Sequence, residues 1–400
     1  MQDAAPPERS KGSDVLPARS ARQEGSTAMK VIIIGGGIVG LSTAWALSRG
    51  GHEAVVFEQG PLPHEGGASY DQHRLIRLPY SDQPGYTAMV VDALKAWQRL
   101  WDDLGESHYA ETGSLALSTE EGDWADLSRQ TLDHLGLDYE TLDRKQIEAL
   151  CPFMTVPENA WGLHNTTGGL LFAARIVDSL LRDLKRRGVT LRDNARVVGV
   201  DPAAGAVTLE NGKRESAESI VVCAGAWTAK LFPELSRRAV AHRQVVAYMQ
   251  PPEAHAESWA KAPVMVHLLN AVDIYAAPPA GGTELQFGCG QHRRPGDPDR
   301  LDPLGENEAA EVAAAFAPLL RDFADYKVLR GQVCPYAVAP DERFVTESNG
   351  PVLLIGGCSG HMFKFGALMG EQLAKTATGD QSFKDFKLWA EGRHQSLTKV

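Results

Sequence analysis

The stretch numbered 31–40 reads VIIIGGGIVG, and its change from branched apolar residues to glycine decides the fold of the N-terminal region. Val31–Ile34 is a β-branched run, which favours a strand buried on both faces. Ile38–Arg49 then favours a helix, which the pair of glycines beginning at Gly50 ends. Because Ala54–Phe57 favours the next strand, the sequence predicts a complete βαβ unit.

The glycines of this stretch match the pattern G-x-G-x-x-G, in which each glycine has a physical task. Gly35 makes the tight turn, Gly37 lets the backbone approach a pyrophosphate, and Gly40 lets helix and strand pack closely. The start of the helix, at Ile38 and Val39, offers unpaired N–H groups to the anion. A glycine-rich turn without a ligand is the opposing interpretation, and the complete βαβ unit argues against it.

Glu58 ends the second strand at a spacing that suits a carboxylate on a ribose hydroxyl group. Two later segments, Ile220–Trp227 and Val352–His361, repeat an apolar strand that ends in small residues. Small residues after a buried strand let backbone N–H groups approach a second part of a long ligand. The glycine motif alone does not distinguish FAD from NAD, but three distant segments that return to one cofactor are typical of FAD.

Composition narrows the class of protein further. The chain has 400 residues, of which 43% are hydrophobic and 23% charged, with a net charge of -11. These values describe a soluble globular protein of one large or two ordinary domains, and the acidic balance argues against nucleic acid as a partner. Because no run of about 18 apolar residues occurs, no membrane helix is expected. Residues 1–28 are polar and contain no apolar core of a signal peptide, so they are expected to form a disordered extension.

The cysteines indicate a reducing compartment. Their number is odd and no pair has the spacing of metal ligands, so we expect reduced thiols in the cytoplasm and no metal site. The cysteines are Cys151, Cys223, Cys289, Cys334 and Cys358.

The order of predicted elements indicates an α/β fold with a discontinuous cofactor domain. Helices are predicted over 86–104, 176–187, 309–320 and 364–376, and strands of a mixed sheet are predicted between 243 and 288. The Rossmann-like pieces are separated in sequence, so the FAD-binding domain is assigned to 29–105, 165–240 and 325–395. A substrate domain with a mixed β-sheet and helices is assigned to 106–164 and 241–324.

The chain resembles the D-amino acid oxidase-type flavoproteins, and within them the group of monomeric sarcosine oxidase and N-methyltryptophan oxidase. The resemblance extends from Lys30 to about Lys387. The segments that carry it are the glycine motif, His73–Arg77, Arg243–Val246, Val333–Tyr336, Pro340–Phe344 and Ser359–Phe365.

This resemblance implies roles for particular residues. Cys334 matches a cysteine that bonds covalently to the flavin, although a lone cysteine otherwise favours a small buried apolar residue. Arg77 and Lys364 match two cations that hold a substrate carboxylate, for which a planar guanidinium and an ammonium are well suited. A surface salt bridge is the alternative for each cation, but Lys364 lies between two phenylalanines, an unusual place for a solvated charge.

The remaining implied roles concern the flavin and the substrate cavity. Tyr275 and Tyr336 match residues that line the cavity, with plain core packing as the alternative. His361 matches a histidine beside the flavin, and its alternative is a core imidazole bonded to the backbone. The resemblance also implies cofactor contacts for Ser69, Arg74, Val197, Gly225, Trp227, Gly360, Phe363 and Lys364.

Several positions depart from the family pattern. An ungapped comparison places Gln286 where the oxidases have a lysine over the flavin that helps dioxygen accept electrons. A neutral amide would stabilise developing negative charge on dioxygen poorly. Tyr70 replaces a histidine, Asp71 replaces a glycine, and the Gly-Ser pair near the phosphates reads Ala-Ser, ending at Ser69. These departures leave the substrate and the electron acceptor open.

The expected activity is FAD-dependent oxidation of the C–N bond of a small amine that carries a carboxylate. A secondary amine, an N-methyl or cyclic amino acid, would deliver a hydride to the flavin, and dioxygen would be reduced to hydrogen peroxide. A monomeric enzyme is expected. The first alternative is a dehydrogenase or biosynthetic tailoring enzyme of the same fold with another electron acceptor. The second is a non-catalytic FAD-binding protein, which the joint presence of Arg77, Lys364 and Cys334 argues against.

Overall fold

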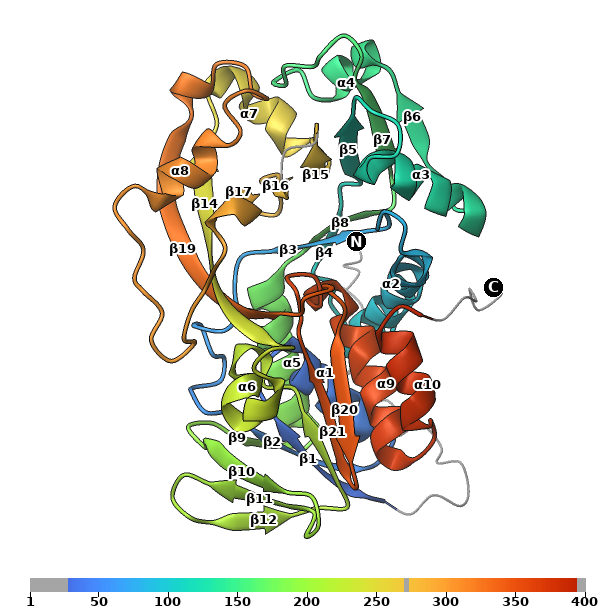
Figure 1. Ribbon diagram of the computed structural model, residues 1–400, viewed down its shortest axis with the longest axis vertical. Helices are drawn as coiled ribbons and strands as arrows, with labels where there is room; N and C mark the ends of the chain where they lie inside the picture. Colours follow the sequence, from blue (N-terminus) through green and yellow to red (C-terminus); the bar gives the residue numbers. More distant parts are fainter. Residues whose placement is uncertain (1–27, 270–272, 394–400) are drawn as a thin grey trace, which may run out of the picture.

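The computed structural model describes residues 28–269 and 273–393 (Figure 1). The predicted disordered extension therefore lies outside the described residues, except for Ala28. Two large sheets form the two ends of the molecule as Figure 1 draws it, and helices pack against both. Within the described ranges, no helix combines the length and apolar character needed to cross a membrane.

The first large sheet has six strands in the order β20-β21-β13-β1-β2-β9. All neighbours are parallel except β20 and β21. The carboxyl ends of parallel strands lie at one edge of a sheet, so the small residues that follow β1, β13 and β21 meet there. The strands are β1 (Lys30–Ile34), β2 (Glu53–Phe57), β9 (Thr190–Arg192), β13 (Ser219–Val222), β20 (Val345–Asn349) and β21 (Val352–Gly356).

Both faces of this sheet are covered, which explains its continuous apolar strands. On one face α1 packs against two other helices, and on the other a three-stranded sheet covers the strands with Val207 and Leu209. The helices are α1 (Ile38–Arg49), α5 (Ala173–Arg186) and α9 (Gly366–Thr378), with α10 (Phe383–Ala390) beside α9. The small sheet contains β10 (Val197–Asp201), β11 (Ala206–Leu209) and β12 (Arg214–Ser216).

The second large sheet has nine strands in the order β18-β14-β17-β16-β15-β5-β7-β6, with β19 paired to β14. It is mixed, because β15 and β5 are parallel while the other pairs are antiparallel. The strands are β5 (Ser114–Ser118), β6 (Glu140–Leu142), β7 (Trp161–Asn165), β14 (Val240–Gln250), β15 (Val264–Leu268), β16 (Ile274–Ala277), β17 (Leu285–Cys289), β18 (Arg294–Pro295) and β19 (Lys327–Val338).

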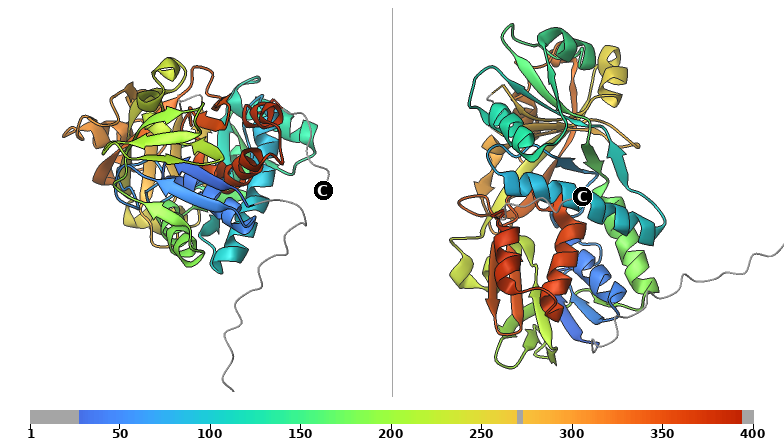
Figure 2. Two further views of the ribbon diagram at one scale, coloured as in Figure 1. Left: turned by 90° about the horizontal axis from the view of Figure 1, so that it is seen from below. Right: turned by 90° about the vertical axis from the view of Figure 1, so that its right-hand side faces the viewer.

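Four helices lie beside this second sheet. A fifth, longer helix lies between the half of the molecule built on the first sheet and the half built on the second. The four are α3 (Trp124–Leu135), α4 (Arg144–Leu150), α7 (Glu253–Ala260) and α8 (Glu308–Ala314). The long helix α2 (Pro84–Leu104) contacts α3 on one side and α9 on the other (Figure 2). A further small sheet joins β3 (Arg74–Arg77), β8 (Gly168–Leu171) and β4 (Tyr109–Glu111).

The predicted α/β fold and its N-terminal βαβ unit are confirmed, with three differences in detail. The helix predicted over 309–320 ends at Ala314, because Pro318 has no N–H to donate to the carbonyl of Ala314. The N–H groups of Phe316 and Ala317 bond instead to carbonyl oxygens three residues earlier. The region from 243 to 288 contains α7 besides its strands. Strand β19 pairs with β14 in the nine-stranded sheet, whereas the sequence assigned its residues to the cofactor domain. The division into domains itself stays a prediction.

Candidate cofactor and substrate site

One cavity of about 840 Å³ extends from the glycine-rich strand ends to the inner face of the nine-stranded sheet. Its volume lies within the roughly 300–1,000 Å³ range of small-molecule sites. Every site residue predicted from the sequence lines this cavity except Gly40. The lining residues among them are Gly35, Gly37, Ile38, Val39, Glu58, Ser69, Arg74, Arg77, Val197, Gly225, Trp227, Tyr275, Gln286, Cys334, Tyr336, Gly360, His361, Phe363 and Lys364.

Gly40 lies outside the cavity and acts in packing. A Cβ atom at Gly40 would lie 1.9 Å from the carbonyl oxygen of Gly35, so only glycine lets α1 approach the preceding turn this closely. Gly35 itself has φ of +114°, and its Cβ would lie 2.4 Å from the carbonyl oxygen of Cys223. These two positions therefore fix the turn that opens the cavity between β1 and α1.

The polar groups around this turn suit a dinucleotide. The carboxylate of Glu58 accepts hydrogen bonds from the backbone N–H groups of Gly36 (2.8 Å) and Gly60 (3.1 Å). Burial alone would raise the pKa of Glu58, but these bonds and a contact with His64 at 3.2 Å lower it below its usual value. An ionised acceptor at the end of β2 fits a ribose hydroxyl group, and the small residues around it leave space for a pyrophosphate.

Ser69 binds the start of the helix directly, because its hydroxyl oxygen accepts a hydrogen bond from the N–H of Ile38 at 3.0 Å. The rings of His64 and Trp227 also line the cavity, and their centres lie 5.5 Å apart. This part of the cavity therefore offers backbone donors, one acid and two aromatic rings. These are the groups that a pyrophosphate, a ribose and a purine require.

Two cysteines line the part of the cavity near the nine-stranded sheet. Cys334 lies on β19 and is partly buried, and burial raises the pKa of its thiol to about 11. The positive charge of Arg74 opposes this effect. Cys358 follows β21, and its thiol donates a weak hydrogen bond to the carbonyl oxygen of Ala337 at 3.5 Å. Each thiol thus keeps its proton at neutral pH until a bound group changes its surroundings.

Arg77 and Lys364 bring two basic side chains into the cavity. Asp273, which also lines the cavity, acts on Arg77 through its charge but forms no ion pair with it. Lys364 is 5% exposed, and burial together with the charge of Arg77 lowers its pKa well below the usual value. Burial also lowers the pKa of Arg77. Among the described residues, no carboxylate forms an ion pair with either cation: Lys364 donates to the hydroxyl of Tyr80, and Arg77 donates to the carbonyl of Pro79. Buried charges are normally paired, so this arrangement has the electrostatics of a site for an anion.

Arg74, in contrast, is fully compensated. It forms an ion pair with Asp71 at 2.6 Å and donates hydrogen bonds to the carbonyl oxygens of His73 and Ala68. Burial alone would raise the pKa of Asp71, but the charge of Arg74 and a hydrogen bond from the hydroxyl of Tyr248 lower it. Asp71 is therefore an ionised, buried acid beside the cavity.

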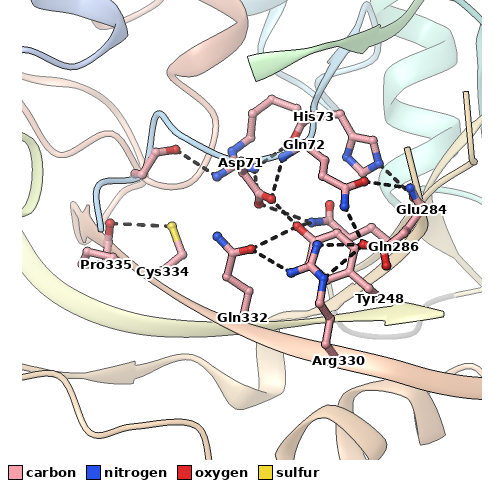
Figure 3. Close-up of polar contacts among 12 residues, drawn as sticks. Asp71, Gln72, His73, Tyr248, Glu284, Gln286, Arg330, Gln332, Cys334 and Pro335 are labelled. Atoms are coloured by element: carbon pink, nitrogen blue, oxygen red, sulfur yellow. Dashed lines mark hydrogen bonds and ion pairs between the residues drawn. The ribbon is translucent and has the colours of Figure 1, made fainter. Parts of the chain in front are cut away.

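Gln286 belongs to the same network. Its amide nitrogen donates to the hydroxyl oxygen of Tyr248 at 3.0 Å and lies 3.4 Å from the carboxylate of Asp71. The side chain of Gln286 is 3% exposed, so it is held by these bonds and carries no charge. In Figure 3 the side chains of Asp71, Tyr248 and Gln286 point toward one another.

The aromatic residues predicted for the cavity lie where the two sheets approach each other. The ring of Tyr275 covers Gly288, where a Cβ atom would lie 2.1 Å from the ring. Tyr336 lies against Gly360, and the ring of His361 stacks on that of Phe344 at 4.6 Å. Burial and the charge of Lys364 lower the pKa of His361 to about 3, so this imidazole is neutral.

The sequence missed three further lining residues that surround Arg77. The guanidinium carbon lies 4.6 Å from the centre of the Tyr80 ring and 4.9 Å from that of Trp124. Trp124 in turn stacks on His267 at 3.9 Å. Tyr80 lies close to the His73–Arg77 segment, which was the only signal for it, and no local pattern indicates Trp124 or His267. In the described part of the chain, no cluster of His, Cys, Asp or Glu could hold a metal ion.

The fold and this cavity define a dinucleotide-binding protein whose cofactor cavity also contains two cations. Residues 30–376 match the model of the family described as FAD dependent oxidoreductase. The chain belongs to this family, and its residues fit the cofactor that the family requires. The expected flavoprotein class is thereby confirmed.

Two relatives cover almost the whole chain. Monomeric sarcosine oxidase from Bacillus sp. (strain NS-129) is 26% identical over 92% of this chain and 97% of its own length. N-methyl-L-tryptophan oxidase from Escherichia coli (strain K12) is 30% identical over 90% of this chain and 96% of its own length. The resemblance to this group of FAD-dependent amine oxidases, drawn from the sequence motifs, is also confirmed.

Solved structures give the same fold. NikD, an unusual amino acid oxidase essential for nikkomycin biosynthesis, superimposes in its open form with a TM-score of 0.77 at 21% identity, covering 92% of this chain and 100% of NikD. Amadoriase I from Aspergillus fumigatus, a fructosyl amine:oxygen oxidoreductase, superimposes with a TM-score of 0.73 at 19% identity over 94% of this chain and 93% of its own.

Proposed function

We propose that this protein oxidises the C–N bond of a small secondary amine that carries a carboxylate, an N-methyl or cyclic amino acid. The observation that carries the proposal is the pair of cations, the partly buried Arg77 and the buried Lys364, which form no ion pair with a described acid and line the same cavity as the glycine motif. A substrate carboxylate would supply the missing negative charge. FAD supplies the hydride acceptor when it is bound.

The side chains contribute mainly by binding and orientation. The guanidinium of Arg77 offers a planar pair of donors to a carboxylate, and Lys364 adds a compact charge. Fixing the carboxylate restricts where the amine can lie, and a correct position can contribute several kcal/mol to lowering the barrier, on the order of 7 or more. Tyr275 and Tyr336 are proposed to exclude water from the reacting bond.

The balance of the reaction is simple. The neutral amine loses a hydride from carbon and a proton from nitrogen, which leaves an imine that water hydrolyses. Two electrons and two protons then reduce dioxygen to hydrogen peroxide. Covalent attachment of FAD through Cys334 is part of the proposal, and the support for it is that this thiol lines the cavity near Arg74. A monomeric enzyme is also proposed, and the five free cysteines support a reducing, cytoplasmic location.

The test is anaerobic mixing of the purified flavoprotein with N-methylglycine, proline and dimethylamine, followed by the absorbance of the flavin. The two amino acids are expected to bleach the flavin and dimethylamine to leave it oxidised, because only the amino acids bear a carboxylate. Arg77→Gln and Lys364→Gln should each lower the bleaching rate by about tenfold or more, the usual effect of losing a charged hydrogen bond. If no amine bleaches the flavin, the non-catalytic alternative replaces this proposal.

A second candidate function, a dehydrogenase with another electron acceptor, is favoured by the state of Gln286. The side chain at this position is a neutral amide bound to Tyr248 and Asp71, and the nearby Arg74 is already paired. Neither group offers an unpaired positive charge to developing superoxide. Reoxidation of the substrate-reduced enzyme by air should then be slow, and reoxidation by an artificial quinone acceptor should be fast.

The substitution Gln286→Lys tests the second candidate. It should raise the rate of reoxidation by air, and Gln72→Lys serves as the matched control because Gln72 bonds to Glu284 and does not line the cavity. Rapid air oxidation of the unmodified enzyme, together with no gain from Gln286→Lys, would favour the oxidase.

A further inference from the structure

Tyr80 contacts both cations of the proposed carboxylate site. The ammonium of Lys364 donates a hydrogen bond to its hydroxyl oxygen at 2.9 Å. The guanidinium carbon of Arg77 lies 4.6 Å from the centre of its ring, and the ammonium nitrogen lies 5.1 Å from the same point. Tyr80 is 7% exposed and lines the cavity, so one buried phenol stabilises two positive charges that repel each other.

Each hydrogen bond around Tyr80 has a defined donor and a defined acceptor. The carbonyl oxygen of Glu342 can only accept, so the ring nitrogen of His361 that lies 2.9 Å from it, Nε2, carries the proton. The other nitrogen, Nδ1, is then an acceptor 3.1 Å from the Tyr80 hydroxyl. Since an ammonium can only donate, the chain of donors runs from Lys364 through Tyr80 and His361 to the backbone. Burial raises the pKa of Tyr80, so the phenol keeps the proton that this chain requires.

This series of hydrogen bonds orients the side chains of the site before a substrate binds. The hydroxyl oxygen of Tyr80 turns its lone pairs toward Lys364 because its hydrogen is held by His361. The electron-rich face of the same ring lies under Arg77, and Trp124 adds a second ring 4.9 Å from that guanidinium. Neither contact supplies a negative charge, so the positive charge of the site is left for an anion to compensate.

We propose that Tyr80 is a positioning residue that orients Arg77 and Lys364 toward a single substrate carboxylate, with His361 fixing the direction of its hydroxyl group. This inference rests on the proposed function. It assigns Tyr80 no contact with the reacting bond, and its effect should be confined to ligands that carry a carboxylate.

The experiment uses the flavin-loaded enzyme and two small probes, propionate and its neutral amide, propionamide. Binding is followed by the change in flavin absorbance over a series of pH values on both sides of neutrality. Tyr80→Phe keeps the ring and removes only the hydroxyl. It is expected to weaken propionate binding roughly ten- to a hundredfold, the usual effect of one hydrogen bond to a charged group, and to leave propionamide binding unchanged.

The pH profile adds a readout that simple loosening of the structure would not give. A hydrogen bond from the ammonium of Lys364 to Tyr80 favours the charged form of the lysine. Its loss in Tyr80→Phe should move the loss of propionate binding at high pH to a lower pH. Tyr86→Phe is the matched control, because the Tyr86 ring stacks on Tyr80 at 5.5 Å while its hydroxyl bonds to the backbone of Ala390 and Phe344 outside the cavity. This control should bind propionate as the wild type does.

Three results would overturn the inference. The first is wild-type propionate affinity and pH profile in Tyr80→Phe, and the second is equal weakening for propionate and propionamide. If Tyr80→Phe yields no folded flavoprotein, His361→Phe keeps a ring beside Phe344 and removes the acceptor of the Tyr80 hydroxyl. Unchanged propionate binding in His361→Phe is the third result that would overturn the inference. Failure of the proposed function is distinguishable, because the wild-type flavin would then respond neither to propionate nor to any amine.

Discussion

At the scale of single residues, the two cysteines of the cavity can be distinguished by substitution. Cys334 lies on β19 close to Arg74, whereas the thiol of Cys358 is bonded to Ala337. If Cys334 attaches the flavin, the yellow colour of the wild type stays with the protein after acid precipitation. Cys334→Ser should release it into the supernatant, and Cys358→Ser, the matched control, should retain it. Release from the wild type, or retention by Cys334→Ser, contradicts covalent attachment at Cys334.

The burial of Lys364 is expected to lower the stability of the folded protein, although the same side chain is proposed to bind the substrate carboxylate. In the unfolded chain a lysine keeps its proton up to about pH 10, whereas burial and Arg77 lower the pKa of Lys364 in the folded protein. The folded state therefore binds fewer protons between the two pKa values. Stability should rise as pH rises through that window, and below the folded pKa this lysine should add no pH dependence.

Lys364→Met tests this cost. Removing a buried, unpaired charge should raise the free energy of unfolding of the flavin-free protein at pH 7 by about 1–4 kcal/mol, while propionate binding is lost. Lys261→Met, at an exposed lysine paired with Glu257, is the control and should change stability little. Thermal unfolding of both variants measures the difference, and a lower melting temperature for Lys364→Met would refute the argument.

At the scale of elements, the contact between α1 and α9 depends on Gly370. A Cβ atom there would lie 2.4 Å from the backbone carbon of Ser42, which is closer than real side chains approach. Gly370→Ala should therefore force the two helices apart and destabilise the protein by about 1–3 kcal/mol, as overpacking usually does. Since α1 begins at the glycine motif, flavin binding should weaken as well.

Gly199 on β10 provides the control for this prediction. Its Cβ would meet only Thr208, at 3.8 Å, so Gly199→Ala should be nearly neutral. Urea unfolding of the two variants, with flavin content measured on the same samples, compares them. Equal stability of Gly370→Ala and the wild type would show that α1 and α9 can separate without cost.

At the scale of the whole molecule, the segment between β18 and α8 leaves the nine-stranded sheet and contacts residues that line the cofactor cavity. Asp299 accepts a hydrogen bond from the indole of Trp227 at 2.8 Å and pairs with Arg196 at 3.2 Å. Asp297 pairs with Lys230 at 2.7 Å. These bonds are exposed, so each alone stabilises the fold little, but together they hold the segment against residues that line the cavity.

The double substitution Asp297→Asn with Asp299→Asn should leave the melting temperature nearly unchanged and make trypsin cleave after Arg300 severalfold faster. Local opening, rather than global unfolding, then controls the cleavage. Asp322→Asn, which removes an exposed pair with His255 elsewhere, is the control and should not change cleavage at this site. Added salt should reproduce the effect in the wild type. Equal cleavage rates in all three proteins would exclude this role for the segment.

The sequence by itself determined the βαβ unit, the α/β class and the meeting of three glycine-rich segments. The repeat of a strand and the backbone conformation of a glycine depend on residues close in sequence. Parallel strands bring their carboxyl ends to one edge of the sheet, whatever connects them. Arg77, Lys364 and Cys334 could be found because the motifs around them resemble known ones.

Only the tertiary structure decided what surrounds these residues. Tyr80 and Lys364 are 284 positions apart, and Asp71 and Gln286 are 215 apart, so neither hydrogen bond leaves a local pattern in the sequence. Which side chains meet across such distances depends on the register of β14, β17 and β19 and on the route of the chain between the sheets. The sequence could therefore name the cations, but the absence of an ion pair at Arg77 and Lys364 and the bonds of Gln286 to Tyr248 and Asp71 follow from packing alone.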